Sequence, residues 1–227
     1  PTPHPSTSRP SARAGRSGTA APPACSGGAG PPSAPPVRGR GGPPAALGMD
    51  TRPPPPPLKE AFAAGCLSTG VDLVDIGVNH TPLMYFAVAH WKLDGGATVT
   101  GSHNPVSDNG VKMVHAAAAP LTEDEIQGLL ASIRAGDFET GAGTRTTRDP
   151  REDYFGAILR HVKLARRLRV VVDAGNGIAG SFAPELLRRL GCEVIELHCE
   201  SDGSFPNHLP DPEMEENVRD LVARVRE

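Results

Sequence analysis

The chain has 227 residues and a net charge of −3 at neutral pH, a length that allows one or two domains. It contains no run of about 20 apolar residues, so the sequence predicts no membrane span. Charge is divided unevenly: residues 1–57 carry six arginines and one acid, Asp50, for +5, and the remainder carries 17 basic and 25 acidic residues, for −8. The arginines follow no pattern typical of nucleic-acid binding, so neither a nucleic acid nor a membrane is expected as a partner.

Residues 1–57 hold 17 of the 25 prolines and have Val37 and Leu47 as their only large aliphatic side chains. Such a segment buries too little apolar area to offset its ordering entropy, and it is predicted to be disordered. Two other interpretations stay open. Arginine, serine and alanine without acids also suit an organellar targeting peptide. No methionine precedes Met49, so the stretch could also be a misread frame and not native coding sequence.

From Leu58 onward, apolar periodicity predicts alternating helices and strands. Helices are expected over 58–70, 83–91, 122–135 and 182–190, with a further one carrying Tyr154, Ile158 and Val162. Strands are expected over 71–76, 97–100, 111–115, 170–173 and 193–198, the fourth being continuously apolar and so of the buried, parallel type. Residues 136–150 read as a linker. The alternation predicts an α/β fold in two units, broken near residues 140–150.

A short β-prone run ends at a glycine, and Ser102 and His103 follow on a turn closed by Asn104-Pro105. Lys112 returns ten residues later on the next β-prone run. A hydroxyl, an imidazole and a cation on neighbouring strand ends are the groups needed to handle a phosphoryl group. From the residues alone, Ser102 also fits an ordinary polar turn, and Lys112 a solvated strand lysine.

The six residues Thr100–Pro105, Thr-Gly-Ser-His-Asn-Pro, resemble the active-site serine loop of the α-D-phosphohexomutases, the phosphomannomutase/phosphoglucomutase family. The resemblance implies that Ser102 carries the phosphate that is passed to the sugar. It places His103 against the reacting groups, as a proton acceptor or hydrogen-bond donor. It assigns Lys112 to offset charge on the transferring group, and Asn104 to shape the loop.

Upstream, Gly48–Arg52 resembles the family's Gly-x-Asp-x-Arg turn after the first strand, which implies that Asp50 and Arg52 shape the loop or the substrate site. This match is partial. Pro43 and Pro44 stand where strand residues should precede the turn, and proline argues against a central strand. The family's opening Tyr-Asp-x-Arg-Gly segment does not occur in these residues.

In the second unit, Gly175–Gly180 spells Gly-x-Gly-x-x-Gly between a predicted strand and a predicted helix, with Glu196 about twenty residues on. This is the context of a dinucleotide-binding loop, which is one alternative function. The same residues also resemble the start of the second phosphohexomutase domain, where the turn is structural. Asp173 ahead of the turn would repel a pyrophosphate. The segment Asp202–Pro212 resembles a phosphohexomutase connection and favours the mutase.

The resemblance implies mixed sheets sandwiched by helices: domain I over 58–145, incomplete at its start, and part of a similar domain II over 150–227. It implies reversible transfer of phosphate between the 1- and 6-positions of a hexose phosphate through a phosphoserine. Glucose or mannose 1,6-bisphosphate would be the activator, and Mg²⁺ would bind Ser102 through its phosphate.

The family's Asp-Gly-Asp-x-Asp metal loop and its sugar- and phosphate-gripping loops do not occur in these 227 residues. We therefore expect negligible turnover from this chain by itself. A third alternative is a non-catalytic fragment or mispredicted product that folds poorly. The four cysteines have no metal-site spacing and are expected to be reduced thiols in the cytoplasm.

Overall fold

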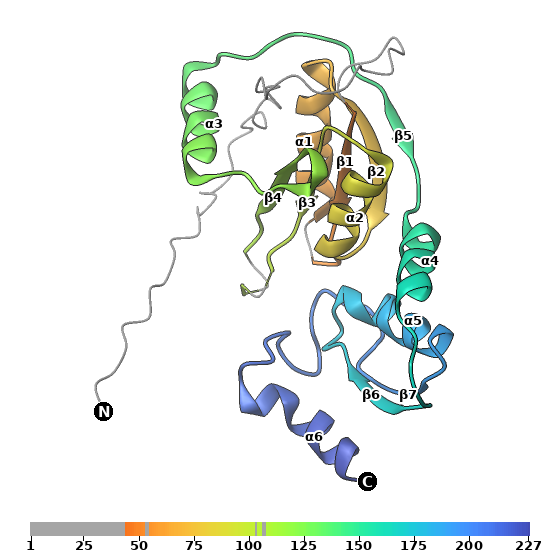
Figure 1. Cartoon of the computed structure of the whole chain (residues 1–227). Coiled ribbons are helices and arrows are strands. Elements are labelled where there is room, and N and C mark those ends of the chain that lie inside the picture. The colour runs from red at the N-terminus through yellow and green to blue at the C-terminus, as the bar shows by residue number, and fades with distance from the viewer. Residues whose placement is uncertain (1–43, 53–54, 103, 106–107) are drawn as a thin grey trace, which may run out of the picture.

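The computed structural model describes residues 44–52, 55–102, 104–105 and 108–227, arranged as two α/β units joined by an extended segment and a helix (Figure 1). The strands are β1 (Pro44–Met49), β2 (Asp72–Val78), β3 (Gly95–Val99), β4 (Val111–His115), β5 (Arg145–Thr147), β6 (Arg169–Asp173) and β7 (Glu193–Leu197). The helices are α1 (Pro55–Ser68), α2 (Thr81–Trp91), α3 (Glu123–Ala135), α4 (Arg151–His161), α5 (Ala183–Arg189) and α6 (Arg219–Arg226). Short 3₁₀ turns are η1 (Ala116–Ala118), η2 (Ile178–Ser181) and η3 (Glu215–Val218).

The first unit is built on a five-stranded sheet in the order β4-β3-β1-β2-β5. Strands β1, β2, β3 and β5 run parallel, and β4 pairs antiparallel with β3. Helices α1 and α2 connect the parallel strands, as crossovers between such strands require. The mixed α/β architecture predicted from the sequence is confirmed.

Strand β1 corrects the expectation that residues up to 57 are disordered and that prolines exclude a central strand. It lies between β2 and β3, with Ala46 paired to Val74 on one side and to Gly96 on the other. Proline is tolerated because Pro44 is the first residue of the strand, where no ladder donor is needed. Its carbonyl still accepts a hydrogen bond from the Asp94 amide at 2.9 Å. The predicted disorder of residues 1–43 lies outside the described residues.

The two faces of this sheet are covered by different helices, because successive side chains of β1 point to opposite sides. Ala46 packs with Met84 and Val88 of α2, whereas Leu47 packs with Phe62 and Cys66 of α1. These side chains are all 1 % exposed or less, except Phe62 at 3 %. Helix α3 starts with a capping box formed by Thr122 and Glu125, and it stands apart from the sheet (Figure 1).

The predicted linker contains a strand that sequence analysis missed. β5 pairs in parallel with β2. Ion pairs of Arg145, as well as backbone hydrogen bonds, hold it in place. Arg145 bonds to Asp75 at 2.5 Å and to both oxygens of Glu60 at 2.6 and 2.9 Å, and Lys59 contacts Asp75 at 2.5 Å. Burial alone would raise the pKa of Asp75, but hydrogen bonds from Lys59 and Arg145 bring it below its usual value. Three-residue strands rich in threonine and arginine have no apolar pattern, so β5 could not be found by periodicity.

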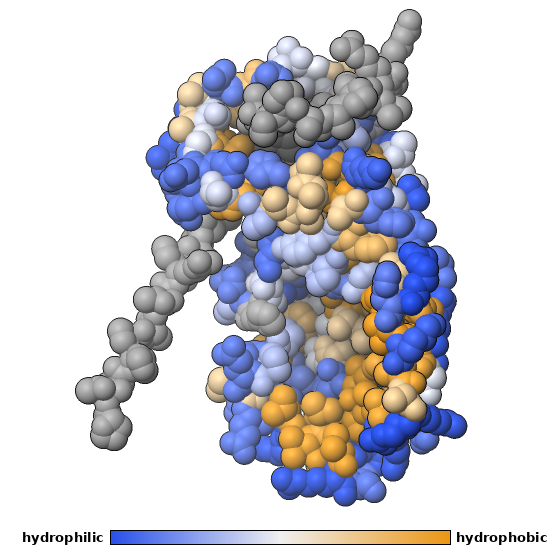
Figure 2. All heavy atoms as spheres, in the orientation of Figure 1, coloured by the Kyte–Doolittle hydropathy of each residue, from blue (hydrophilic) through white to orange (hydrophobic). Residues whose placement is uncertain are grey.

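The second unit has β6 and β7 paired in parallel, as the continuous apolar run predicted. The valines of β6 are half-buried, not fully buried as that run predicted. Figure 2 shows apolar residues gathered on the visible face of this unit. This sheet has two strands among the described residues. Each strand therefore has a neighbour on one side only, and its side chains are less buried than those of a central strand.

The units meet through a buried apolar cluster, which contains Leu83 of α2, Phe155 of α4 and Phe182 beside α5. The His80 ring, which caps α2 by accepting a bond from the Leu83 amide, lies 4.7 Å from the Phe182 ring between centroids. Within the described residues, no helix is long and apolar enough to cross a membrane.

Candidate active site

Ser102 lies immediately beyond the carboxyl end of β3, on the loop that leads to β4. Two hydrogen bonds between Thr100 and Gly110, at 3.0 and 3.1 Å, close the base of this loop. The Ser102 side chain is exposed, and its backbone has φ of 54°, in the left-handed region. A non-glycine residue there costs on the order of 1 kcal/mol and is held by its surroundings. The loop therefore presents the hydroxyl outward from a fixed backbone.

Arg52 stabilises the backbone of the serine loop through hydrogen bonds. Its guanidinium donates to the Asn104 carbonyl at 2.6 Å, to the Pro105 carbonyl at 3.2 Å and, through the other terminal nitrogen, to the Ser102 carbonyl. The side chain is 2 % exposed, and burial lowers the pKa of Arg52 although Asp50 and Asp108 oppose that shift. The bonds come from two terminal nitrogens of one rigid planar group, a geometry that the single ammonium nitrogen of a lysine does not reproduce.

Asp50 organises the other side of the loop. Its Oδ2 accepts from the Thr100 hydroxyl at 2.7 Å and from the Gly101 amide at 3.3 Å, and its Oδ1 accepts from the Arg52 amide at 3.0 Å. The Thr100 hydroxyl oxygen in turn accepts from the Ser102 amide at 3.0 Å. Asp50 and Arg52 thus contact the serine loop from the end of β1. Their predicted role, in shaping the loop or in binding substrate, stays a prediction.

Lys112 lies on β4 opposite Thr98 of β3. Residues paired across strands share a face of the sheet, and residues two apart on one strand do too, so Lys112 shares its face with Thr98 and Thr100. The Lys112 side chain is exposed and forms no hydrogen bond or ion pair with the described residues. No described residue neutralises the charge of this ammonium group. His103 lies outside the described residues, so its predicted role is untested.

Phe205 joins the site although sequence analysis assigned it no role. The Arg52 guanidinium lies over its ring, 5.4 Å from the centroid. Phe205 is 8 % exposed and has φ of 53°. It belongs to the segment Asp202–Pro212, whose sequence resembles a phosphohexomutase connection. That resemblance was the signal that could have pointed to Phe205. The second unit thus contacts the residue that holds the serine loop.

The described residues around Ser102 do not by themselves fit Mg²⁺. That ion takes octahedral oxygen ligands, and it usually needs at least one or two carboxylates besides phosphate and water. Both oxygens of Asp50 already accept hydrogen bonds from the loop and from Arg52.

The glycine-rich turn of the second unit is filled by the chain itself. The Asn176 side chain donates to the Glu200 carbonyl at 2.9 Å and accepts from Asn207 at 2.7 Å, and it is 5 % exposed as a residue. A Cβ at Gly180 would lie 2.0 Å from the Cys199 carbonyl oxygen, so this glycine serves close packing. The turn leads into η2 and the seven-residue α5, not directly into a long helix. These contacts disfavour the dinucleotide alternative.

Comparison with protein families finds two matches. Residues 35–140 match the family model described as phosphoglucomutase/phosphomannomutase, alpha/beta/alpha domain I. Residues 152–227 match the model for alpha/beta/alpha domain II of the same family.

Similar proteins carry related names. A phosphomannomutase/phosphoglucomutase of Pseudomonas putida is 43 % identical over 80 % of this chain and 39 % of its own length. A phosphoglucomutase of Neisseria gonorrhoeae is 41 % identical over 79 % of this chain and 39 % of its length. A probable phosphoglucosamine mutase of Pyrococcus horikoshii is 38 % identical over 79 % of this chain and 42 % of its length. The chain thus spans about two fifths of the length of the curated relatives that it matches.

Solved structures agree. A phosphoglucomutase/phosphomannomutase family protein from Burkholderia thailandensis superposes with a TM-score of 0.77 at 42 % identity, over 82 % of this chain and 42 % of that one. A structure described as a phosphomannomutase from Thermus thermophilus gives a TM-score of 0.64 at 30 % identity, over 82 % of this chain and 44 % of that one.

Proposed function

Since the chain belongs to the phosphoglucomutase/phosphomannomutase family, we propose that it is the serine-loop part of a hexose-phosphate mutase. The reaction is reversible movement of phosphate between the 1- and 6-positions of a hexose. The observation that carries this proposal is the serine loop: Ser102 is exposed at a strand end, on a backbone that Arg52 and Asp50 hold through hydrogen bonds.

In the proposed transfer, the Ser102 oxygen attacks a phosphorus of a hexose 1,6-bisphosphate, and the bond from that phosphorus to the sugar oxygen breaks. The serine proton passes to a base, the role given to His103, and the leaving sugar oxygen gains a proton. The products are phosphoserine and a hexose monophosphate. In the reverse direction, phosphoserine gives its group to the free hydroxyl of a monophosphate.

Lys112 is proposed to lie beside the transferring group and to stabilise its negative charge. Its support is an exposed ammonium group that no described residue pairs with, on the same sheet face as Thr100. The family's use of Mg²⁺ is carried to this protein as a proposal, in which Ser102 would contact the ion through its phosphate. Glucose or mannose 1,6-bisphosphate is the proposed activator. The named relatives differ in their sugar, so the substrate class proposed is hexose phosphate.

We also propose that the domains meet near residue 150, with the first beginning at β1 and the second at α4. The proposed compartment is the cytoplasm, since Cys192 and Cys199 are both free thiols, as a reducing environment allows. Negligible turnover by these 227 residues alone remains part of the proposal.

The test is a stoichiometric one. The chain is incubated with glucose 1,6-bisphosphate and Mg²⁺, and released hexose monophosphate is counted by chromatography. Up to one equivalent per chain, with little further turnover, is expected. Ser102→Ala should release none, while Ser132→Ala on helix α3 should behave as the unaltered chain. Release that persists in Ser102→Ala would contradict the proposal.

A further inference from the structure

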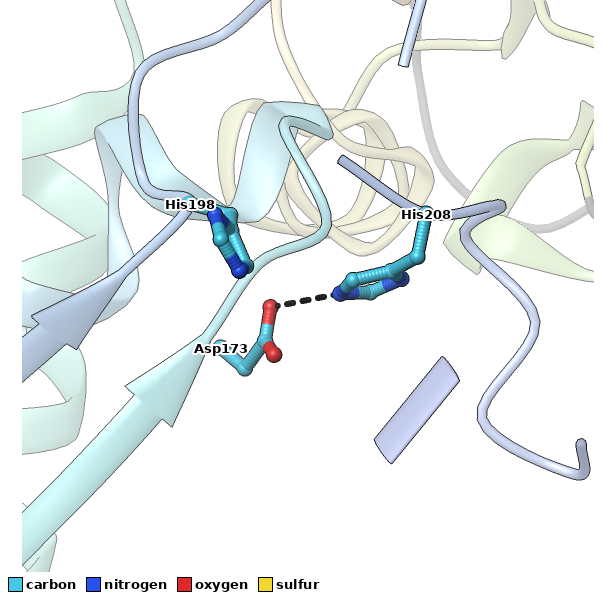
Figure 3. Close-up of side chains that lie close together, drawn as sticks. All are labelled: Asp173, His198 and His208. Carbon is cyan, nitrogen blue, oxygen red and sulfur yellow. Dashed lines mark hydrogen bonds and ion pairs between the residues drawn. The ribbon is translucent and has the colours of Figure 1, made fainter. Parts of the chain in front are cut away.

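A second cluster of reactive side chains lies at the carboxyl ends of β6 and β7, where parallel strands place their last residues together. Asp173 is the last residue of β6, His198 follows β7 directly, and His208 reaches in from the connection beyond. Figure 3 shows the two imidazole rings beside the carboxylate, with His208 joined to it. Sequence analysis assigned a ligand role to neither histidine.

The geometry brings one ligand atom of each residue close to the others. His208 Nε2 lies 3.0 Å from Asp173 Oδ1, and a nitrogen or oxygen from all three residues falls within 4.8 Å of the others. The two rings stand 5.4 Å apart between centroids and nearly perpendicular, at 82°.

Two polar atoms in this cluster lack hydrogen-bond partners among the described residues: Asp173 Oδ2 and His198 Nε2. The Asp173 side chain is only 4 % exposed, so water does not readily serve it. The nearest charge to His198 Nε2 is Asp220 Oδ2 on α6, at 3.7 Å, which is too long for a hydrogen bond. A buried carboxylate oxygen without a hydrogen-bond partner destabilises the fold, and each such group calls for an explanation.

Neighbouring backbone groups already orient the ligands. His208 Nδ1 lies 2.9 Å from the Leu209 carbonyl oxygen, so Nδ1 carries the proton and Nε2 faces Asp173. Asp173 Oδ1 accepts from the Gly175 amide at 2.9 Å. A ring nitrogen donating to a backbone carbonyl while the other faces the metal is the usual arrangement of metal-binding histidines. His198 has φ of 48°, which shows that its backbone is also held in an uncommon conformation.

We propose that Asp173, His198 and His208 bind a divalent transition-metal ion of the Zn²⁺ class. Two imidazoles and one carboxylate suit Zn²⁺, whereas Mg²⁺ prefers oxygen ligands throughout. The site goes beyond the proposed transfer at Ser102 and uses none of its residues. A fourth position is open to water or to Asp220. Ligand atoms around tetrahedral Zn²⁺ lie about 3.3 Å apart for bonds of about 2 Å, so the His198 ring moves inward on binding.

The ion would link residues 202–208 of the Asp202–Pro212 segment to the carboxyl ends of β6 and β7. That segment also carries Phe205, whose ring lies under Arg52. Without the ion, His208 Nε2 lies within hydrogen-bond distance of Asp173 Oδ1, at 3.0 Å. Histidine ligates a metal in its neutral form, so binding of the ion requires Nε2 without a proton.

The test is isothermal titration of Zn²⁺ into the untagged, chelator-treated chain, followed by Co²⁺ absorption spectra. We expect one saturable site per chain, and visible d–d bands for Co²⁺. Asp173→Asn, His198→Gln and His208→Gln should each weaken binding by at least about tenfold, since even residues supporting the ligands have effects of that size. His115→Gln, at an exposed histidine of β4 paired with Glu125, should bind as the unaltered chain does.

Circular dichroism of each variant without metal separates lost folding from lost binding, and the glutamine variants keep hydrogen-bonding groups in place. Absence of saturable Zn²⁺ binding in the folded chain would overturn the proposal. So would undiminished binding in the three variants, or a Co²⁺ spectrum with thiolate bands lost in Cys199→Ser. The two proposals have separate readouts, release of hexose monophosphate for Ser102 and saturable Zn²⁺ binding for Asp173, His198 and His208, so the failure of one is distinguishable from the failure of the other.

Discussion

Arg52 hydrogen-bonds through its guanidinium to the carbonyl of Ser102, which lies 50 residues further along the chain. The same group donates to the Asn104 and Pro105 carbonyls. One buried side chain therefore holds three backbone carbonyls of the serine loop. The position of the proposed nucleophile thus depends on the residues that follow β1.

We predict that Arg52→Lys lowers phosphate incorporation at Ser102 by at least about tenfold, because an ammonium group cannot serve three carbonyls as a planar fork does. Arg134→Lys, in the last turn of α3, is the matched control and should have no effect. Phosphopeptide quantification after incubation with the bisphosphate gives the comparison. Equal incorporation in both variants would show that Arg52 is dispensable.

Two glycines flanking the serine loop should respond differently to alanine. A Cβ at Gly101 would lie 2.3 Å from Arg52 Nη1 and 2.4 Å from the Asp108 carbonyl oxygen, so Gly101→Ala must displace the loop. A Cβ at Gly110 would meet only the Thr100 carbonyl oxygen at 3.5 Å, an ordinary contact. We expect phosphorylation of Ser102 to be largely lost in the first variant and retained in the second. The opposite order would mean that the loop adopts another conformation.

The Asp75 carboxylate should matter more for stability than for chemistry. Asp75→Asn leaves the buried Lys59 ammonium without a counter-charge, and such a change costs about 3–5 kcal/mol. Glu60→Gln removes only the exposed partner of Arg145, worth about 1 kcal/mol or less. Urea denaturation followed by circular dichroism measures both. Similar losses in the two variants would contradict a buried role for Asp75.

His80 should make stability pH-dependent between about pH 4 and 6.5. Burial, with a contribution from Arg151, lowers its pKa from 6.5 to about 4. The unfolded chain therefore binds a proton in this window that the folded chain does not. Stability is fully present above pH 6.5 and falls as the pH drops, by on the order of 3 kcal/mol.

His80→Asn keeps a side-chain acceptor for the Leu83 amide and removes the titrating ring. The difference in unfolding free energy between the unaltered chain and this variant should shrink toward acid pH. A difference that stays constant from pH 7.5 to 4.5 would show that His80 does not titrate as its burial implies.

Sequence reasoning located the elements with strong local signals. The helices expected over 83–91 and 122–135 and the strand expected over 111–115 depend on neighbouring residues, and the structure contains each. β1 was wrongly excluded because Pro44 was judged without knowing that it occupies the first position of the strand. β5 was missed because its place is determined by pairing with β2 and by the Arg145–Asp75 contact, both far apart in sequence.

Local sequence signals located the serine loop of the proposed site, whereas the contacts around that loop join residues far apart in the sequence. The serine loop could be named from six consecutive residues, but the hold of Arg52 on it depends on distant pairing of β1 with β3. The Asp173, His198 and His208 cluster joins residues up to 35 positions apart, and no local spacing signals it.

The most direct test of the account is peptide mass spectrometry on the chain after incubation with glucose 1,6-bisphosphate and Mg²⁺. The account predicts phosphate on the peptide containing Ser102, lost in Ser102→Ala and reduced in Arg52→Lys. Phosphate on another residue, or an unphosphorylated Ser102 peptide from correctly folded chain, would contradict it.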